Sequence, residues 1–200
     1  GKSAFSGCQK LKSVKLPSNI TTLEFDLFSG CAIEMISLPP SIATIQSNVF
    51  CGCPIREVKL PESLTFLSGF NRCEQLKEIA IPNSVTEIGS CAFAECTNIE
   101  HIRLPNGITT LGSHSFWYCR SLERVTLPET LTAIENDAFR DCESLVELSL
   151  PECVAEIGIR AFSSCKNLKC INIPNGIKEI GKEVFSECES LTELTLPIGI

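Results

Sequence analysis

A 23-residue repeat dominates the sequence and limits what the chain can fold into. Four consecutive copies begin at residues 89, 112, 135 and 158, and the first reads GSCAFAECTNIEHIRLPNGITTL. Each copy places the same apolar residues at the same positions, around a Phe that is followed three residues later by a Cys. A fixed period in this range is typical of a solenoid, whose units are stable only against their neighbours. The sequence therefore predicts one elongated domain with a linear core.

The repeat extends over all 200 residues. The units span 1–23, 24–45, 46–67, 68–88, 89–111, 112–134, 135–157, 158–180 and, as a partial ninth, 181–200. Units two to four are shortened, and the fourth lacks two residues before Phe70, which predicts a tighter turn there. No stretch resembles a linker, so we expect a single domain over 1–200. The terminal units lack the polar caps that solenoids generally need, and we expect a fragment of a longer array.

Each unit contains two segments with the pattern of extended chain. Val125 and Leu127 alternate with polar residues, which is the period-two pattern of a strand with one buried face. Pro128 follows and ends the ladder, because proline has no N–H to donate. Leu131 and Ile134 mark a second, shorter extended segment. We expect a parallel sheet on one face of the solenoid, with short turns or 3₁₀ segments elsewhere.

The Phe and the Cys of each unit belong on the inner face of one helical or 3₁₀ turn. We expect the nine phenylalanines from Phe5 to Phe185 to form a buried column. Nine of the 13 cysteines keep the same period, namely Cys8, Cys31, Cys53, Cys73, Cys96, Cys119, Cys142, Cys165 and Cys188. Many cysteines in a short chain would favour disulfides, but a periodic cysteine is better explained as a small buried residue. A disulfide ladder is the alternative.

The other four cysteines, Cys51, Cys91, Cys153 and Cys170, lie at differing repeat positions. Cys51 and Cys53 look like a metal or redox pair, but no second pair or histidine stands at ligand spacing. There is no nucleophile elbow, P-loop or dinucleotide fingerprint. His101 and His114 have no carboxylate partner at regular spacing, so we expect both at the surface. We therefore expect no metal, no cofactor and no catalysis; a hydrolase is disfavoured because no site stands out from the repeat.

The charge balance disfavours two classes of partner. The chain carries 24 acidic and 17 basic residues, for a net charge of −7, without a block of like charge. This balance argues against nucleic acid and against purely electrostatic binding to an anionic membrane. No apolar run is long enough to span a bilayer. We expect a protein or glycan ligand instead.

The outward strand positions form the first candidate binding surface. Two residues before the prolines stand Lys15, Ser37, Lys59, Ala80, Arg103, Thr126, Ser149, Asn172 and Thr195, and none of them is acidic. His101 and Arg124 lie in the neighbouring outward column. We expect Lys15, Lys59, His101, Arg103 and Arg124 to contribute to an extended recognition face. The alternative is a solvated face whose Lys and Glu residues pair across strands with little effect on stability.

The second candidate is Trp117 with Tyr118, the only Trp and the only Tyr of the chain. They stand between Phe116 and Cys119, where other units carry small or polar residues, so the positions are expected to face solvent. Two adjacent exposed aromatics would make an anchor for a protein or glycan. Alternatively, the rings fold over the neighbouring turn and cover its apolar surface.

The repeat L-x-x-[VI]-x-[LI]-P-x-x-[IVL]-x-x-[IL]-[GE]-x-x-x-F-x-x-C resembles the BspA-type leucine-rich repeats, also called the Treponema pallidum type. The resemblance covers the whole chain and rests on the LP or IP step and on Ala92-Phe93 with Cys96. It implies a curved, right-handed solenoid with a parallel sheet on its concave side. It also implies a cell-surface or secreted protein that adheres to host matrix, host cells or other microbes.

Together these observations predict a non-catalytic module that binds a protein or a glycan. The alternative from another class is a structural spacer, a stiff stalk that presents another domain and has no ligand of its own.

Overall fold

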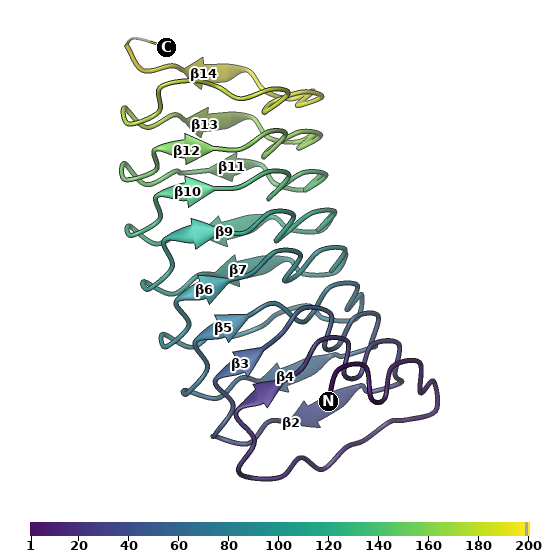
Figure 1. The fold of residues 1–200 in the computed structure, drawn as a ribbon. Helices are drawn as coiled ribbons and strands as arrows, with labels where there is room; N and C mark the ends of the chain where they lie inside the picture. The colour runs from purple at the N-terminus through teal and green to yellow at the C-terminus, as the bar shows by residue number, and fades with distance from the viewer. Residues whose placement is uncertain (199) are drawn as a thin grey trace.

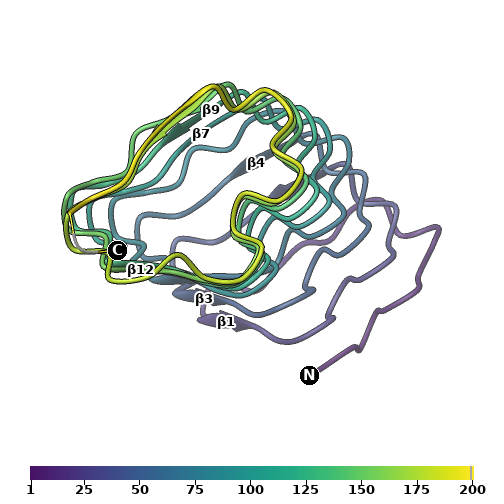
Figure 2. The same cartoon turned by 90° about the horizontal axis from the view of Figure 1, so that it is seen from above.

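The computed structural model describes residues 1–198 and 200, which form a coil of stacked turns (Figure 1). Each turn of the coil is one sequence repeat, and the described residues contain strands and turns but no helix. Seen along the coil, the later turns superimpose closely, whereas the first turns are progressively displaced (Figure 2). The displaced turns are those of the N-terminal units, which include the three shortened ones.

The segment after each proline forms the more continuous of the two faces. Its strands are β1 (Thr22–Leu23), β3 (Thr44–Ile45), β5 (Phe66–Leu67), β6 (Glu87–Ile88), β8 (Thr110–Leu111), β10 (Ala133–Ile134) and β12 (Glu156–Ile157). They pair in this order in one parallel sheet and in register with the equivalent residues of the next unit; between β6 and β8 the pair is Ile88 with Leu111. The second residue of every strand is buried. The second extended segment expected from the sequence is therefore present in seven successive units.

The segment before each proline forms the opposite face. Its strands are β2 (Met35–Ser37), β4 (Glu57–Lys59), β7 (His101–Arg103), β9 (Arg124–Thr126), β11 (Glu147–Leu148), β13 (Cys170–Asn172) and β14 (Glu193–Thr195). In strands such as β4 and β7 the middle residue is buried and both neighbours are exposed, as the period-two pattern predicts. These strands are also parallel, but they pair in three separate groups, β2–β4, β7–β9 and β11–β13–β14.

The largest interruption of this face lies in the shortest unit, 68–88. Among the described residues, no backbone hydrogen bond joins segment 78–80 to β4 or to β7. Only the amide of Glu100 reaches across, to the carbonyl of Lys77 at 3.3 Å. The sequence predicted a tighter turn before Phe70 in this unit, but it did not indicate that the ladder on this face would open.

The phenylalanine column forms the centre of the core. Successive rings lie 5.2–6.0 Å apart between centroids, and most pairs are within 13° of parallel. The pair Phe50–Phe70 is tilted by 31°, where the shortest unit begins. The seven rings from Phe28 to Phe162 are at most 1% exposed. The expectation of nine buried rings was wrong at the ends: Phe5 is 46% exposed and Phe185 is half-buried, because each has a neighbour on one side only.

The cysteine column is bonded to the phenylalanine column through the backbone. Every thiol from Cys31 to Cys188 in the periodic set lies 2.9–3.2 Å from the carbonyl oxygen of the Phe in the preceding unit, and donates to it. That carbonyl also accepts the amide of the Cys in its own unit, as Phe93 does from Cys96 at 3.1 Å. A cysteine is both small enough for the column and able to donate. All 13 cysteines are free thiols in the structure, and seven of the nine periodic ones are buried; Cys8 in the first unit is exposed and Cys188 in the last is half-buried, so the packing interpretation fits the interior units.

Eight of the nine turns around the Phe use two left-handed residues, and the turn at Phe70 has only the second, Arg72. Non-glycine residues two positions before the Phe have φ between 51° and 61°, as at His114 and Asp137. A second left-handed residue follows two positions after the Phe; it is Gly7, Gly30 and Gly52 in the first three units, and residues such as Tyr118 later. These kinks keep the segment a series of single turns. The helical or 3₁₀ turn expected from the sequence is thus one hydrogen-bonded turn from Phe to Cys.

Truncation of a central ring should destabilise the solenoid strongly. We expect Phe116→Ala to lower the free energy of unfolding by about 3–5 kcal/mol, because a fully buried aromatic leaves a cavity that its stacked neighbours cannot fill. Urea denaturation followed by circular dichroism measures the change. Phe5→Ala is the matched control and should cost clearly less, since nearly half of that ring is exposed. Equal losses at both positions would contradict a cooperative central column.

Thiol reactivity should divide the cysteines by burial. Cys8, Cys153 and Cys170 are exposed. Burial raises the pKa of Cys53 and of Cys119 to about 12, so their reactive thiolates are scarce at neutral pH. Titration of the native protein with a chromogenic disulfide should show three fast thiols, and all 13 after denaturation. Cys170→Ser should remove one fast thiol. Fewer than 13 in the denatured, unreduced protein would reveal disulfides.

Candidate binding groove

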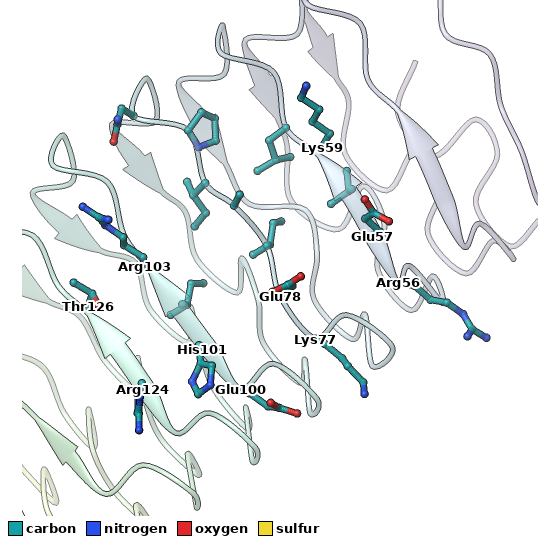
Figure 3. Close-up of a pocket in the computed structure, with 18 of the residues that line it drawn as sticks. Arg56, Glu57, Lys59, Lys77, Glu78, Glu100, His101, Arg103, Arg124 and Thr126 are labelled. Atoms are coloured by element: carbon teal, nitrogen blue, oxygen red, sulfur yellow. The ribbon is translucent and has the colours of Figure 1, made fainter.

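An open groove of about 1360 Å³ hollows the face that carries the three-residue strands. It crosses units three to six, from β4 across segment 78–80 to β7 and β9 (Figure 3). Its polar rim consists mainly of ionisable side chains, namely Arg56, Glu57, Lys59, Glu62, Lys77, Glu78, Glu100, His101, Arg103 and Arg124. The groove is therefore a shallow, charged surface rather than an enclosed apolar pocket.

The shortest unit creates the middle of the groove. Segment 78–80 has no strand partner on either side, so the buried middle residues Val58, Ile79 and Ile102 reach the groove and form its floor. The residue of this segment two positions before the proline is Ala80, whereas Lys59 and Arg103 occupy the same position in the flanking units. A small side chain at this point leaves space between two long cationic ones. The hollow is thus a product of one short unit and one small residue.

The structure brings four of the predicted binding residues to this groove. Lys59 lines it on the β4 side, and His101, Arg103 and Arg124 line it on the β7 and β9 side. Lys15 does not belong to it, because Lys15 lies in the first unit, in a segment without a strand. Glu78 and Lys77 also line the groove, and the sequence analysis did not single them out. Their relevance could have been found from the deletion in unit four. The binding role of all these residues remains a prediction.

Among the described residues, most basic side chains of the groove have no ion pair. Within residues 1–198 and 200, neither Lys59, Arg103 nor Arg124 has a carboxylate oxygen within 4.0 Å. Arg56 is different, since its Nε lies 3.5 Å from Glu34 Oε2. The alternative of cross-strand Lys–Glu pairs would have placed such contacts along this face. Most ion pairs of the described chain instead join successive units elsewhere, as Arg120 with Glu143 does at 3.6 Å.

Trp117 and Tyr118 lie on the turn beside the Phe column, on another part of the surface. The expectation that both positions face solvent was only partly right, because both side chains are half-buried. Trp117 Nε1 donates to Asp141 Oδ2 at 3.1 Å, and the His114 ring meets the indole edge to face at 5.9 Å. The guanidinium of Arg120 lies 4.0 Å from the centre of the Tyr118 ring. These contacts agree with the alternative in which the rings cover the turn.

An ion cluster around the buried carboxylate of Asp137, on the same turns, was missed by the sequence analysis. The carboxylate of Asp137, whose side chain is 2% exposed, accepts from Arg160 Nε at 2.8 Å and from Arg160 Nη2 at 3.1 Å. Arg140 Nη1 lies 3.3 Å from Asp137, and His114 Nε2 lies 3.6 Å from it. His114, Asp137 and Arg160 occupy one repeat position, 23 residues apart. The expectation that His114 has no carboxylate partner at regular spacing was therefore wrong.

The cluster has a structural rather than a chemical character. Burial alone would raise the pKa of Asp137, but the hydrogen bond and charge of Arg160, with His114 and Arg140, outweigh burial and hold the pKa below its ordinary value. A carboxylate held in this way is a poor proton acceptor.

Within the described residues, no three His, Cys, Asp or Glu side chains converge as metal ligands would. No helix of that part of the chain is long and apolar enough to cross a membrane.

A model of the BspA type leucine rich repeat region matches residues 1–123 and 109–200, in six copies. The chain belongs to this family. The resemblance seen in the repeat motif is thereby confirmed. A leucine-rich repeat protein of T. pallidum supports the assignment, with 31% sequence identity, a TM-score of 0.70 and coverage of 76% of each chain. A search of the curated proteins found no match.

Two longer solved structures share the fold. The first, a leucine rich cell surface protein of Faecalibacterium prausnitzii, is 24% identical with a TM-score of 0.64 and aligns over 96% of this chain and 61% of its own. The second, the pneumococcal vaccine antigen PcpA, is 25% identical with a TM-score of 0.67 and aligns over 97% and 53%. This chain therefore spans only about half to three fifths of these two relatives. A binding or structural role fits the family.

Loss of the Asp137 charge should destabilise the solenoid in a pH-dependent way. We expect Asp137→Asn to cost about 1–3 kcal/mol at pH 7, because the buried acceptor of Arg160 loses its charge. The folded-state pKa lies below the unfolded value, so this contribution is complete above roughly pH 4 and is lost as the pH falls through the folded pKa. Urea denaturation across pH 7 to 2.5 measures it.

Arg120→Gln is the control for this prediction, because Arg120 and Glu143 form a more exposed ion pair. Its effect should be small at all pH values. A wild-type advantage over Asp137→Asn that persisted unchanged at the acid end would show that packing, and not the carboxylate charge, is responsible.

Proposed function

We propose that this chain is a non-catalytic protein- or glycan-binding module of a cell-surface or secreted protein, which adheres to host matrix, host cells or other microbes. The observation that carries the proposal is the groove, where Lys59, Arg103 and Arg124 have no ion partner within the described part of the chain, although the net charge of the chain is −7. Unpaired cations around a hollow offer charge-assisted hydrogen bonds to a ligand. His101 belongs to the same surface.

Two further observations support the setting of this proposal. One relative is described as a cell surface protein and another as a vaccine antigen, and both descriptions agree with display outside the cell. Lys15 and the pair Trp117 and Tyr118 would be secondary contacts, separate from the groove. Because the aromatic rings are half-buried, they would contribute a smaller anchor than freely exposed rings.

The second candidate function is a structural spacer that presents another domain. The continuous sheet from β1 to β12 and the stacked phenylalanines favour it, since both run along the coil and stiffen it. A spacer requires no ligand of its own. It would tolerate substitutions throughout the groove without loss of function.

The test is binding of the purified chain to immobilised matrix proteins and glycans at rising salt. The variant Arg103→Glu/Arg124→Glu should bind any ligand that the wild-type chain binds roughly tenfold or more weakly. Each charge reversal replaces an attraction to the ligand with a repulsion. Lys178→Glu/Lys182→Glu is the matched control, with the same change in net charge on residues outside the groove. Thermal unfolding should be nearly unchanged in both variants.

The remaining outcomes separate the alternatives. Equal binding by wild type and the arginine variant would exclude the groove and direct attention to Trp117→Ala and Tyr118→Ala. If the folded chain binds no ligand of the panel, the spacer is the better account.

A further inference from the structure

The two halves of the groove differ in charge. On the paired strands β7 and β9 the outward residues are His101, Arg103, Arg124 and Thr126, so the strands of this half present three basic groups and a hydroxyl. The carboxylate that lines this half, Glu100, precedes β7. His101 stands opposite Arg124, and Arg103 stands opposite Thr126. Basic residues directly opposite each other do not stabilise a strand pair. This arrangement therefore has no evident role in the stability of the fold.

The β4 half of the groove carries both signs. Glu57 on β4 and Glu78 on segment 78–80 occupy the same repeat position in successive units, and Figure 3 shows them beside Arg56, Lys77 and Lys59. Neither glutamate has an ion partner within 4.0 Å in the described part of the chain, and Arg56 is paired to Glu34. A ligand with uniform negative charge would be attracted to β7 and β9 and repelled by these carboxylates.

The backbone between the two halves is open. Because segment 78–80 makes no backbone hydrogen bond to β4 or β7, its N–H and C=O groups depend on solvent for partners. Ala80 is exposed and small, so a ligand can approach the backbone closely here. A peptide that crosses the strands here lies over open backbone, and its side chains reach the charged residues on either side.

We propose that the groove binds an extended peptide segment of a protein partner, with acidic side chains toward Arg103 and Arg124 and a basic side chain toward Glu57 and Glu78. The peptide lies over Ala80 and crosses the strands from β4 to β9. Thr126 and His101 complete the site for the carboxylates. This inference rests on the proposed binding function of the groove, and it narrows the ligand to protein rather than to sulfated glycan.

Synthetic probes of defined charge test the proposal. Labelled peptides of about eight residues cross the groove when extended, at roughly 3.3 Å per residue. Two of these peptides carry two Glu residues at one end and two Lys residues at the other, separated by an uncharged spacer. In the first peptide the Glu residues are N-terminal, and in the second they are C-terminal. The comparison probes are oligoglutamate of equal length and a sulfated heparin oligosaccharide. Fluorescence anisotropy of the folded chain at low and at physiological salt gives the affinities.

We expect one mixed-charge peptide to bind roughly tenfold or more tightly than oligoglutamate and the sulfated probe. Arg103→Glu/Arg124→Glu should abolish this preference, and a peptide with Lys in place of its two Glu residues should regain binding to that variant. Glu57→Lys/Glu78→Lys should instead improve binding of oligoglutamate. Lys178→Glu/Lys182→Glu is again the control and should change none of these affinities.

Four outcomes would overturn the inference. If the sulfated probe binds best and depends on Arg103 and Arg124, the groove binds glycans, and only the proposed binding function survives. If the swapped peptide does not regain binding to the arginine variant, direct charge pairing is absent. If no peptide binds at low salt, but a matrix protein still binds through residues outside the groove, the ligand site lies elsewhere. If neither the peptides nor the immobilised matrix proteins and glycans bind, the proposed function fails as well.

Discussion

The structure depends on one contact that recurs in every unit, the stack of a Phe ring on the Phe of the unit before. The stack is reinforced by the thiol three residues later, which donates to the carbonyl of the preceding Phe at 2.9–3.2 Å. Each unit thus supplies one ring of the stacked pair and the donor thiol, and the neighbouring unit supplies the other ring and the acceptor carbonyl. This is why no unit has a core of its own, and why the rings at Phe5 and Phe185 lose burial.

The same dependence explains how a small change in one unit produces a site. Successive Phe rings of the column are held with their centroids 5.2–6.0 Å apart. A unit that is two residues short therefore cannot keep both strand faces of the coil in register. The face after the proline retains its ladder through β5, β6 and β8, whereas the face before it opens around segment 78–80. The groove and its unpaired backbone follow from this compromise, and the charges on β4, β7 and β9 then determine what it attracts.

Repeat position also explains which interactions escaped sequence reasoning. His114, Asp137 and Arg160 were unremarkable in separate units, because outward residues vary freely from copy to copy. Once the left-handed residues are stacked, the three side chains lie in one row and an ion cluster results. Trp117 likewise gained a partner in Asp141 of the next unit. In a solenoid, a residue's nearest neighbours are one period away, and chemistry between them has to be sought at that spacing.

The sequence by itself determined the periodic part of this protein: the coil, its parallel strands, the Phe and Cys columns, and the candidate residues Lys59, His101, Arg103 and Arg124. These follow from identical side chains repeated at 23 residues, since only stacking buries all of them at once. The tertiary structure alone decided where the ladder opens, which cations remain unpaired, and that Lys15 lies apart from the groove. Those features depend on how units of unequal length share one core, and no single unit contains that information.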